Sequence, residues 1–335
     1  MKQMQFLFTF LFLSFLPFGH AAVSFFGGSM PVAVMQGAVY SALQNELNHN
    51  DKVFCAFPSD RYAKATTTGG EHLNSLFSPN NKRMNEKKVS TGAFVASVLL
   101  SQNEWDIKKL ISDCKADWNM DIPYDNNAEM LVAFMGDITL AVTIMPAPVP
   151  NQEAEHYAKA NYMWKDAVEM TKSHKAHILV SVLGKDAGLF EKGKLFTKVV
   201  SSCLKQKGAI AVYTDGAVFE PRFYCDVASV MQQDDDVLPI LDWVWFGVYQ
   251  TKEHAGIYTY GMRKFGKEEM EVYAENADLN NVRHFLLEIV TYVLDCDVTL
   301  KDGETIGFSE DQKLDITLSD AIALEGKSLK IKYPQ

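Results

Sequence analysis

The stretch AGIYTYGMRKFGKEEMEVY, residues 255–273, decides how the second half of this chain folds. Residues 257–262 alternate like a β-strand, and Gly261 and Gly266 bracket a basic run that is typical of a tight turn. Three glutamates follow on a second extended segment. The stretch therefore predicts a strand, a turn and a second strand, with aromatic and charged side chains gathered around the turn.

The pattern over residues 91–188 predicts the element order β-α-β-β-α-β, which is the ferredoxin-like arrangement. The expected elements are a strand at 94–100, a helix with Ser101 and Glu104 as its capping box, a hairpin over 129–145 that turns at Gly136-Asp137, a helix capped by Asn151, and a strand at 176–183. The helix after Asn151 is expected to end near 172–175, where basic residues suit the negative end of the helix dipole.

The rest of the chain predicts a second round of the same element order. The expected elements are helices at 189–206, 220–233 and 279–296, the last capped by Asp278, and strands at 210–214, 243–249, 256–262 and 270–273. We therefore predict an α+β protein of two ferredoxin-like units with antiparallel-rich sheets, at residues 91–188 and 189–335. A single compact domain over 91–335 is the alternative.

The N-terminus resembles a secretory signal peptide, because Lys2 precedes a run over 6–18 rich in Phe and Leu, which small residues follow. This run is too short to span a bilayer, so residues 1–21 are expected to be cleaved off, leaving no membrane span. The pattern predicts a periplasmic or extracellular protein. The alternative is a misassigned start, with Met30 as the initiator and a cytoplasmic protein. Residues 22–90 predict an irregular arm with one helix.

The composition is that of a globular protein, since 47% of the 335 residues are hydrophobic and 22% are charged. A formal net charge of −10 argues against a nucleic-acid binder, which needs clustered Lys and Arg to grip phosphates. The five cysteines form no CxxC pair. Cys114 and Cys203 lie on the apolar stripes of expected helices, which favours buried free thiols.

One cluster of residues has the composition of a metal site: Glu153, His156, His174 and His177. A carboxylate and a histidine three residues apart share one face of a helix, and imidazole and carboxylate suit Zn²⁺ or Fe²⁺. An unbroken helix would hold His156 and His174 about 27 Å apart, at 1.5 Å per residue. The structural alternative places His174 at a helix C-terminus and His177 in a hydrogen bond where the next strand begins.

Other signatures of catalysis are missing from the sequence. No GxSxG, HExxH, P-loop or GxGxxG spacing occurs, so we expect no cofactor and name no catalytic residue. The acidic run Asp234-Asp235-Asp236 lacks the glycine turn and the distal glutamate of an EF-hand loop, which favours a solvated helix end.

The turn quoted above holds the candidate binding residues: Tyr258, Tyr260, Arg263, Lys264 and Glu269. Aromatic, cationic and anionic side chains are enriched together at surfaces that bind other proteins. The structural alternative is that the tyrosines cover a sheet while Arg263, Lys264 and Lys267 pair with the neighbouring glutamates across the turn.

A family resemblance rests on six segments that begin after Thr91. They are SVLLSQNEWDIKKL (97–110), PAPVP (146–150), MWKDA (163–167), HKAHILVSVLG (174–184), YTYGMRKFGKEEMEV (258–272) and DGETIGFSEDQKLDIT (302–317). In order and spacing they resemble a bacterial family known as domain of unknown function 4261. The family has no established activity, ligand or catalytic residue, so the resemblance implies none for this chain, and the family would not lead us to expect an export signal.

These observations favour a non-enzymatic binding or protein-interaction module, of the inhibitor or immunity type, with another protein as its partner. Two other functions stay open. One is a metal-assisted hydrolase that uses the histidine and glutamate cluster, and the other is a structural component of the cell envelope.

Overall fold

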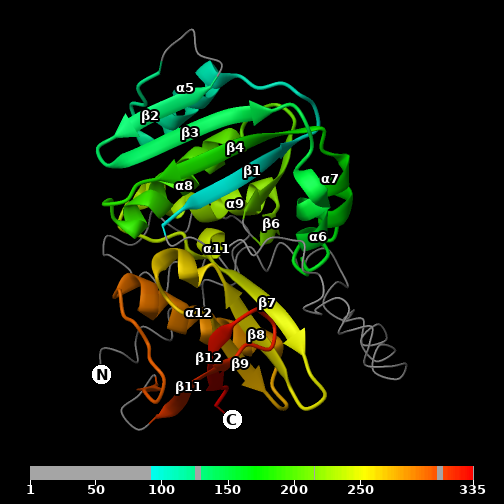
Figure 1. Ribbon diagram of the computed structural model, residues 1–335, viewed down its shortest axis with the longest axis vertical. Coiled ribbons are helices and arrows are strands. Elements are labelled where there is room, and N and C mark those ends of the chain that lie inside the picture. The colour runs from blue at the N-terminus through cyan, green and yellow to red at the C-terminus, as the bar shows by residue number, and fades with distance from the viewer. Residues whose placement is uncertain (1–91, 125–129, 215, 308–311, 335) are drawn as a thin grey trace, which may run out of the picture. The chain divides into compact units, whose positions relative to one another are not determined.

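The strands of the chain build two separate sheets in the computed structural model, which describes residues 92–124, 130–214, 216–307 and 312–334 (Figure 1). The described residues belong to one compact unit, Asn81–Gln335. The expected signal peptide (1–21), the N-terminal arm (22–90) and its helix lie outside the described residues, so these expectations stay predictions.

The first sheet has six strands in the order β2-β3-β4-β1-β5-β6, and every neighbouring pair is antiparallel. The strands are β1 (Phe94–Leu100), β2 (Leu131–Met135), β3 (Ile138–Met145), β4 (Ala176–Leu183), β5 (Ala209–Thr214) and β6 (Ala217–Phe219). The predicted hairpin over 129–145 is confirmed, with Gly136 at a φ of 61° in its turn.

Three helices cover one face of this sheet: α5 (Ile107–Trp118), α8 (Leu189–Cys203) and α9 (Pro221–Ala228). The helix α8 packs directly on β1 and β4, and α5 and α9 pack on α8. The apolar stripe predicted for α8 is buried, including Phe196 and Val199, and this burial fixes the helix on the sheet. Helices α10 (Val230–Gln233) and α11 (Ile240–Trp243) continue from α9.

The start of α5 differs from the prediction. The side chain of Asp106 caps the helix by accepting a hydrogen bond from the Lys109 amide at 3.0 Å. The predicted capping box is wrong, because the Ser101 hydroxyl donates instead to the carbonyl oxygen of Gly208. A contact 107 residues away in sequence thus replaces the local one.

The predicted single helix after Asn151 is broken into two short helices. A 3-10 turn, η3 (Pro150–Gln152), leads into α6 (Glu153–Ala158), and α7 (Ala167–Ser173) follows a gap. Asn151 does not cap a helix and has a φ of 57°. The break occurs at Asn161, whose side-chain oxygen accepts hydrogen bonds from the amides of Met163 and Trp164. The two helices pack on the other face of the first sheet, against Leu99, Ala211 and Tyr213.

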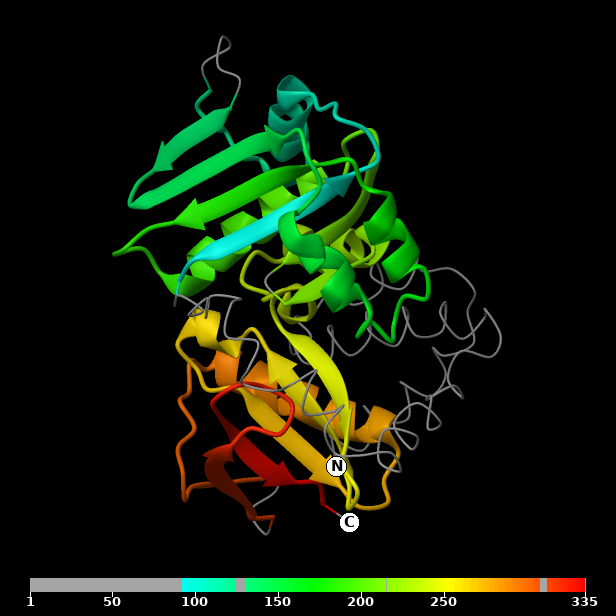
Figure 2. The same cartoon turned by 45° about the vertical axis from the view of Figure 1, so that its right-hand side comes forward.

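The second sheet has six strands in the order β10-β11-β12-β9-β8-β7. They are β7 (Trp245–Gln250), β8 (Ala255–Tyr260), β9 (Met270–Ala274), β10 (Thr305–Ile306), β11 (Leu314–Asp320) and β12 (Lys327–Lys332). Only the pair β9 and β12 is parallel among the described strands. The helix α12 (Leu279–Asp295) packs behind β8 and β9 (Figure 2), and Asp278 caps it as predicted.

The α+β class is confirmed, but the ferredoxin-like order is not the observed one. In a ferredoxin-like unit each helix links two parallel strands that another strand separates. Here β3 and β4 are direct antiparallel neighbours, although α6 and α7 lie between them in sequence. The first sheet also extends beyond residue 188, because β5 pairs with β1. The predicted boundary at 188 and 189 therefore does not coincide with the boundary between the sheets.

Aromatic packing joins the two halves. The 3-10 turn η4 (Met262–Phe265) inserts Phe265 between Trp243 and Phe94, with ring centroids 4.7 and 5.4 Å away. Gly193 on α8 lies against the same rings, and a Cβ there would crowd Trp243. The stretch that opened the sequence analysis therefore anchors the second sheet to the first.

Candidate functional site

The turn between β8 and β9 is built around the buried carboxylate of Glu269. This side chain is 2% exposed and accepts hydrogen bonds from the amide of Gly261 at 2.9 Å and the hydroxyl of Thr259 at 2.8 Å. The amide of Arg263 donates to it as well, at 3.3 Å. Burial raises the pKa of Glu269, and these hydrogen bonds oppose that rise. Glu269 was predicted to contact a partner, but it lies inside and holds the turn.

The other four predicted binding residues do not share one exposed surface. Lys264 is 7% exposed, and its carbonyl accepts a hydrogen bond from the Gly92 amide. Arg263 is half-buried as a residue, and its guanidinium donates to the carbonyl of Lys327 at 2.9 Å. Tyr258 and Tyr260 are half-buried. The ring of Tyr258 lies across Gly247, and that of Tyr260 lies across Gly216, where a Cβ would overlap the ring.

A second buried carboxylate, Glu271, organises the loop that leads to β12. It accepts hydrogen bonds from the amides of Ile322 and Ala323 at 2.9 Å and forms an ion pair with Lys330. Lys267 pairs with Asp297 at 2.7 Å. The predicted pairing of charges across the turn is therefore wrong for Lys267 and Glu271. The period of two along an extended segment could have indicated this, because it places Glu269, just before β9, on the same side as Glu271 within the strand.

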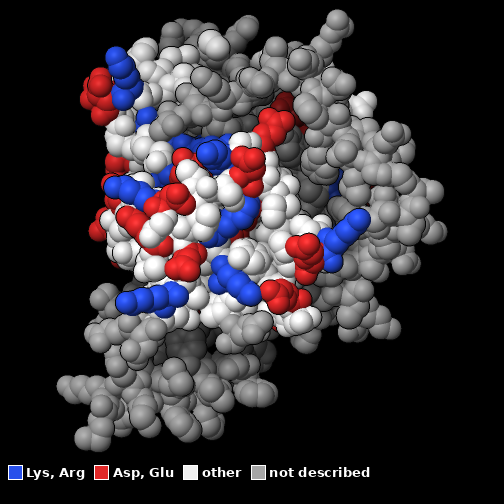
Figure 3. All heavy atoms as spheres, turned by 60° about the horizontal axis from the view of Figure 1, so that its bottom comes forward, with Lys and Arg blue, Asp and Glu red and all other residues white. Residues whose placement is uncertain are grey.

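The face of the molecule that Figure 3 shows carries acidic and basic side chains in alternation. No large field of one sign forms on it among the described residues. This mixture agrees with the sequence argument against a nucleic-acid interface, which requires clustered positive charge.

Because the predicted helix is broken near Asn161, α6 and α7 pack against each other, and His174 lies near a residue of α6. The Nδ1 of His174 lies 4.0 Å from a carboxylate oxygen of Glu155. The two ring nitrogens of His174 are nevertheless engaged with the backbone. Its Nε2 accepts a hydrogen bond from the Val149 amide at 2.8 Å, and its Nδ1 donates to the carbonyl of Thr171. The structural role predicted for His174 at the helix C-terminus is confirmed.

The other members of the cluster also have structural contacts. The Nδ1 of His177 donates to the carbonyl of Ala147 at 2.9 Å, and burial lowers the pKa of this imidazole. The ring of His156 packs edge-on against Tyr157. Glu153, the fourth member, lies in the first turn of α6. Over the described residues, no three His, Cys, Asp or Glu side chains are placed to hold one metal ion. Glu153, His156, His174 and His177 therefore do not converge on a common metal position.

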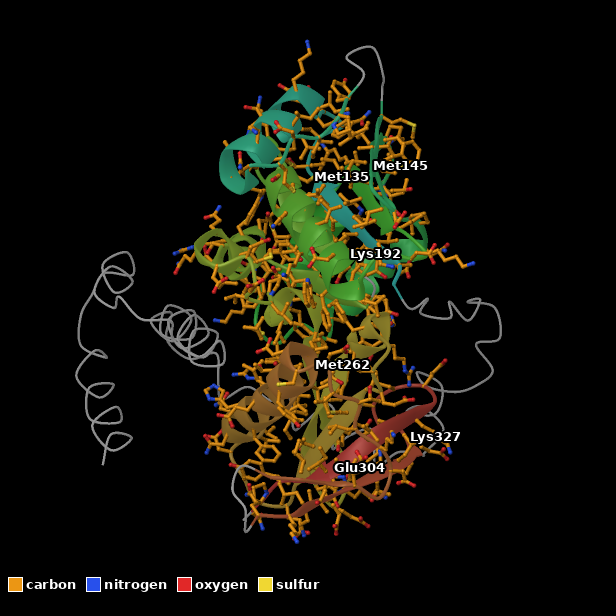
Figure 4. The ribbon with its side chains drawn as sticks, turned by 90° about the vertical axis from the view of Figure 1, so that its left-hand side faces the viewer. Met135, Met145, Lys192, Met262, Glu304 and Lys327 are labelled. Carbon is orange, nitrogen blue, oxygen red and sulfur yellow. The ribbon has the colours of Figure 1, made fainter. Side chains whose placement is uncertain are left out.

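A surface that the sequence reasoning missed lies on the first sheet. We call it the open face, and its residues are Val95, Val132, Phe134, Thr139, Ala141, Ser181 and Leu183. In Figure 1 no helix of the described part lies in front of β2, β3 and β4. Figure 4 shows Met145 projecting from the same side of the sheet, away from α5 and α8.

The strand register brings these side chains into rows across the sheet. Phe134 stands opposite Thr139, which stands opposite Leu183. In the next row Val132, Ala141, Ser181 and Val95 follow one another across β2, β3, β4 and β1. The exposed fraction is 73% for Phe134, 45% for Leu183, 43% for Val132 and 39% for Val95.

The open face has no formal charge. None of the strands β1 to β4 contains an Asp, Glu, Lys or Arg residue. Such strands are typical of sheets buried on both faces, whereas a solvent-exposed face usually alternates apolar and polar residues. This lack of alternation was the sequence signal, and it predicts that a further layer covers the open face.

One comparison with known proteins gives a match, and it covers part of the chain. Residues 258–332 match a family model described as Domain of unknown function (DUF4261). The resemblance is confirmed for this DUF4261 segment, while its extension over 91–257 stays a prediction. The DUF4261 segment includes the second half of β8, the turn held by Glu269 and the strands β9 to β12.

Two further comparisons gave no match. Neither a curated protein nor a solved structure matches this chain. Among helices of the described ranges, none combines the length and apolar content needed to cross a bilayer.

Proposed function

We propose that this chain is a non-enzymatic protein-interaction module whose contact surface is the open face of the first sheet. The supporting observation is the exposure of Phe134, Leu183 and Val132 on β2 and β4, in a group of four neighbouring strands without Asp, Glu, Lys or Arg. Burying one large apolar side chain contributes about 1.5–3 kcal/mol, so covering this face drives association. Contiguous exposed apolar patches of this kind mark interaction sites in soluble domains.

The shape of the surface favours a protein over a small molecule. Small ligands bind in concave sites that enclose most of their surface. The hollow of about 570 Å³ in the described part lies elsewhere, at α5, and is lined by Ile111, Met120 and Ile122 among others. The open face instead presents rows of side chains over four neighbouring strands, which suits another protein layer.

The role we propose is that of an inhibitor or immunity-type partner. Antiparallel ladders and the helices behind them hold the face in one conformation, so binding costs little ordering entropy. Tyr258, Tyr260 and Arg263 are the half-buried members of the predicted turn surface and provide a second contact region in this proposal. Such a role predicts that the captured partner loses its own activity on binding.

The proposal is tested by capture from the native source with the full chain. Leu183→Lys and Val95→Lys place charges on the open face, where the side chains are 45% and 39% exposed, and leave the core intact. Ile322→Lys is the matched control, because Ile322 is 45% exposed outside the first sheet. A partner that binds the wild type and the control, but neither face variant, supports the proposal. Equal capture by all four proteins contradicts it.

We also propose the exported location that the N-terminal pattern predicts. Sequencing the N-terminus of the mature protein tests it. A first residue at Ala22 supports export, and a first residue at Met1 or Met30 contradicts it.

A further inference from the structure

We propose that β2 pairs antiparallel with β2 of a second copy of this chain, so that two first sheets form one continuous sheet. This self-pairing rests on the proposed function only because both involve exposed side chains of β2. Self-association uses the edge of the sheet, and the partner of the proposed function uses its face. The two can therefore fail separately.

The first observation is that β2 is the edge strand that the described residues leave unprotected. Exposed edges invite pairing with another chain, and proteins usually cover or shorten them. At β6 the side chain of Asn161 donates to the carbonyl of Val218 at 2.8 Å. At β7 the hydroxyl of Tyr162 donates to the carbonyl of Phe246 at 2.6 Å. The fourth edge, β10, has only two residues.

The edge of β2 has none of these protections. Within the described ranges, no side chain donates to or accepts from the backbone of β2, and the strand contains no proline or charged residue. Its five residues, LVAFM, pair with β3 alone. Side chains thus bind backbone groups at β6 and β7, whereas the described residues leave the backbone groups at the outer edge of β2 without such contacts.

The second observation is that β2 is complementary to itself. A two-fold axis through Ala133 places Val132 opposite Phe134 of the second copy, and the reverse pair follows by symmetry. Both residues lie on the open face, so each pair joins an aromatic and a β-branched side chain. Because the axis is perpendicular to the sheet, the two open faces lie on the same side and become one larger face.

The self-complementary sequence of β2 favours a second copy as the occupant, and the charge of the edge is compatible with it. The chain carries a formal net charge of −10, so two copies repel each other at long range, and the contacting strand must add no further repulsion. The strand β2 meets this condition, and its self-pairing brings no like charges together along the ladder. A strongly charged partner would find no ion pair on this edge.

Sedimentation analysis of the full chain over a wide concentration range tests the proposal. We expect a reversible dimer whose dissociation constant rises about tenfold or more in Phe134→Lys, since each lost cross-strand pair is worth up to about 1 kcal/mol and symmetry removes two. Val132→Lys should act in the same direction. The matched control is Leu183→Lys, on the open face but on β4, which should leave the dimer unchanged.

Hydrogen exchange locates the interface. Amides of residues 131–135 should gain protection as the protein concentration rises, and those of β6 should not. A monomer at every concentration overturns the proposal, and so does a dimer without added protection at 131–135. If Leu183→Lys abolishes partner capture in a protein that stays monomeric, the self-pairing fails and the proposed function stands.

Discussion

A buried carboxyl group should make the stability of this protein fall as the pH rises. Asp242 on α11 is 3% exposed, and neither of its carboxylate oxygens has a hydrogen-bond partner among the described residues. Burial raises the pKa of Asp242 well above its ordinary value. Its charge also contributes, after burial, to raising the pKa of Tyr224 and to raising that of Cys225 to about 12.

The sign of the effect follows from proton linkage. The unfolded chain releases the Asp242 proton at about pH 3.9, whereas the folded chain keeps it to a higher pH. The stabilisation is complete below the unfolded pKa and is lost as the pH rises toward the folded pKa. Within that window the free energy of unfolding decreases by about 1.4 kcal/mol for each pH unit.

Urea denaturation across this pH range, with wild type and Asp242→Asn, measures the effect. The isosteric amide cannot titrate, so the variant should gain on the wild type by about 1.4 kcal/mol per pH unit above about pH 4. Asp236→Asn is the control, because Asp236 is exposed and should leave the slope unchanged. Parallel stability curves for wild type and Asp242→Asn would refute the reasoning.

Two further predictions concern the turn after β8. Glu269→Ala should lower the free energy of unfolding by about 2–4 kcal/mol, because three donors lose their buried acceptor. Glu268 is exposed, so Glu268→Ala, the control, should change this free energy by less than about 0.5 kcal/mol. Equal effects of the two substitutions in urea denaturation would contradict the buried role of Glu269. Gly261→Ala should cost more than about 3 kcal/mol, since its φ is 130° and a Cβ would overlap the carbonyl oxygen of Trp243. Gly136 has a φ of 61° and open space around it, so Gly136→Ala should lower the stability by only about 1–2 kcal/mol in thermal melts. A larger loss of stability in Gly136→Ala than in Gly261→Ala would contradict this reasoning.

Most elements of the fold could be read from local patterns. The strand Phe94–Leu100 and the helix capped by Asp278 form where the sequence predicts them, because apolar spacing and a capping side chain act within a few residues. The hairpin at Gly136 follows from its turn residues in the same way. The family resemblance likewise led to the DUF4261 segment, which the comparison confirms.

The candidate site could be predicted only in part. The sequence drew attention to the turn around Arg263, but it could not show that Lys264 and Glu269 are buried. The backbone around these residues is held by contacts with Gly92 and with Leu329 on β12, which no local pattern records. The exposure of Phe134 was missed for the opposite reason, because an uncharged strand predicts cover on both faces.

The sequence by itself determined the α+β class, the positions of the strands from β1 to β9 except β6, and the apolar stripes of α8 and α12. These follow from periodicity and capping, which are local and need no partner. The tertiary structure alone decided that β5 joins the first sheet, that Asn161 breaks the predicted helix and that β2 remains an open edge. The pairing of β5 with β1 and the bond of Asn161 to Val218 depend on which distant backbone group satisfies a hydrogen bond, and that choice is made only when the sheet assembles.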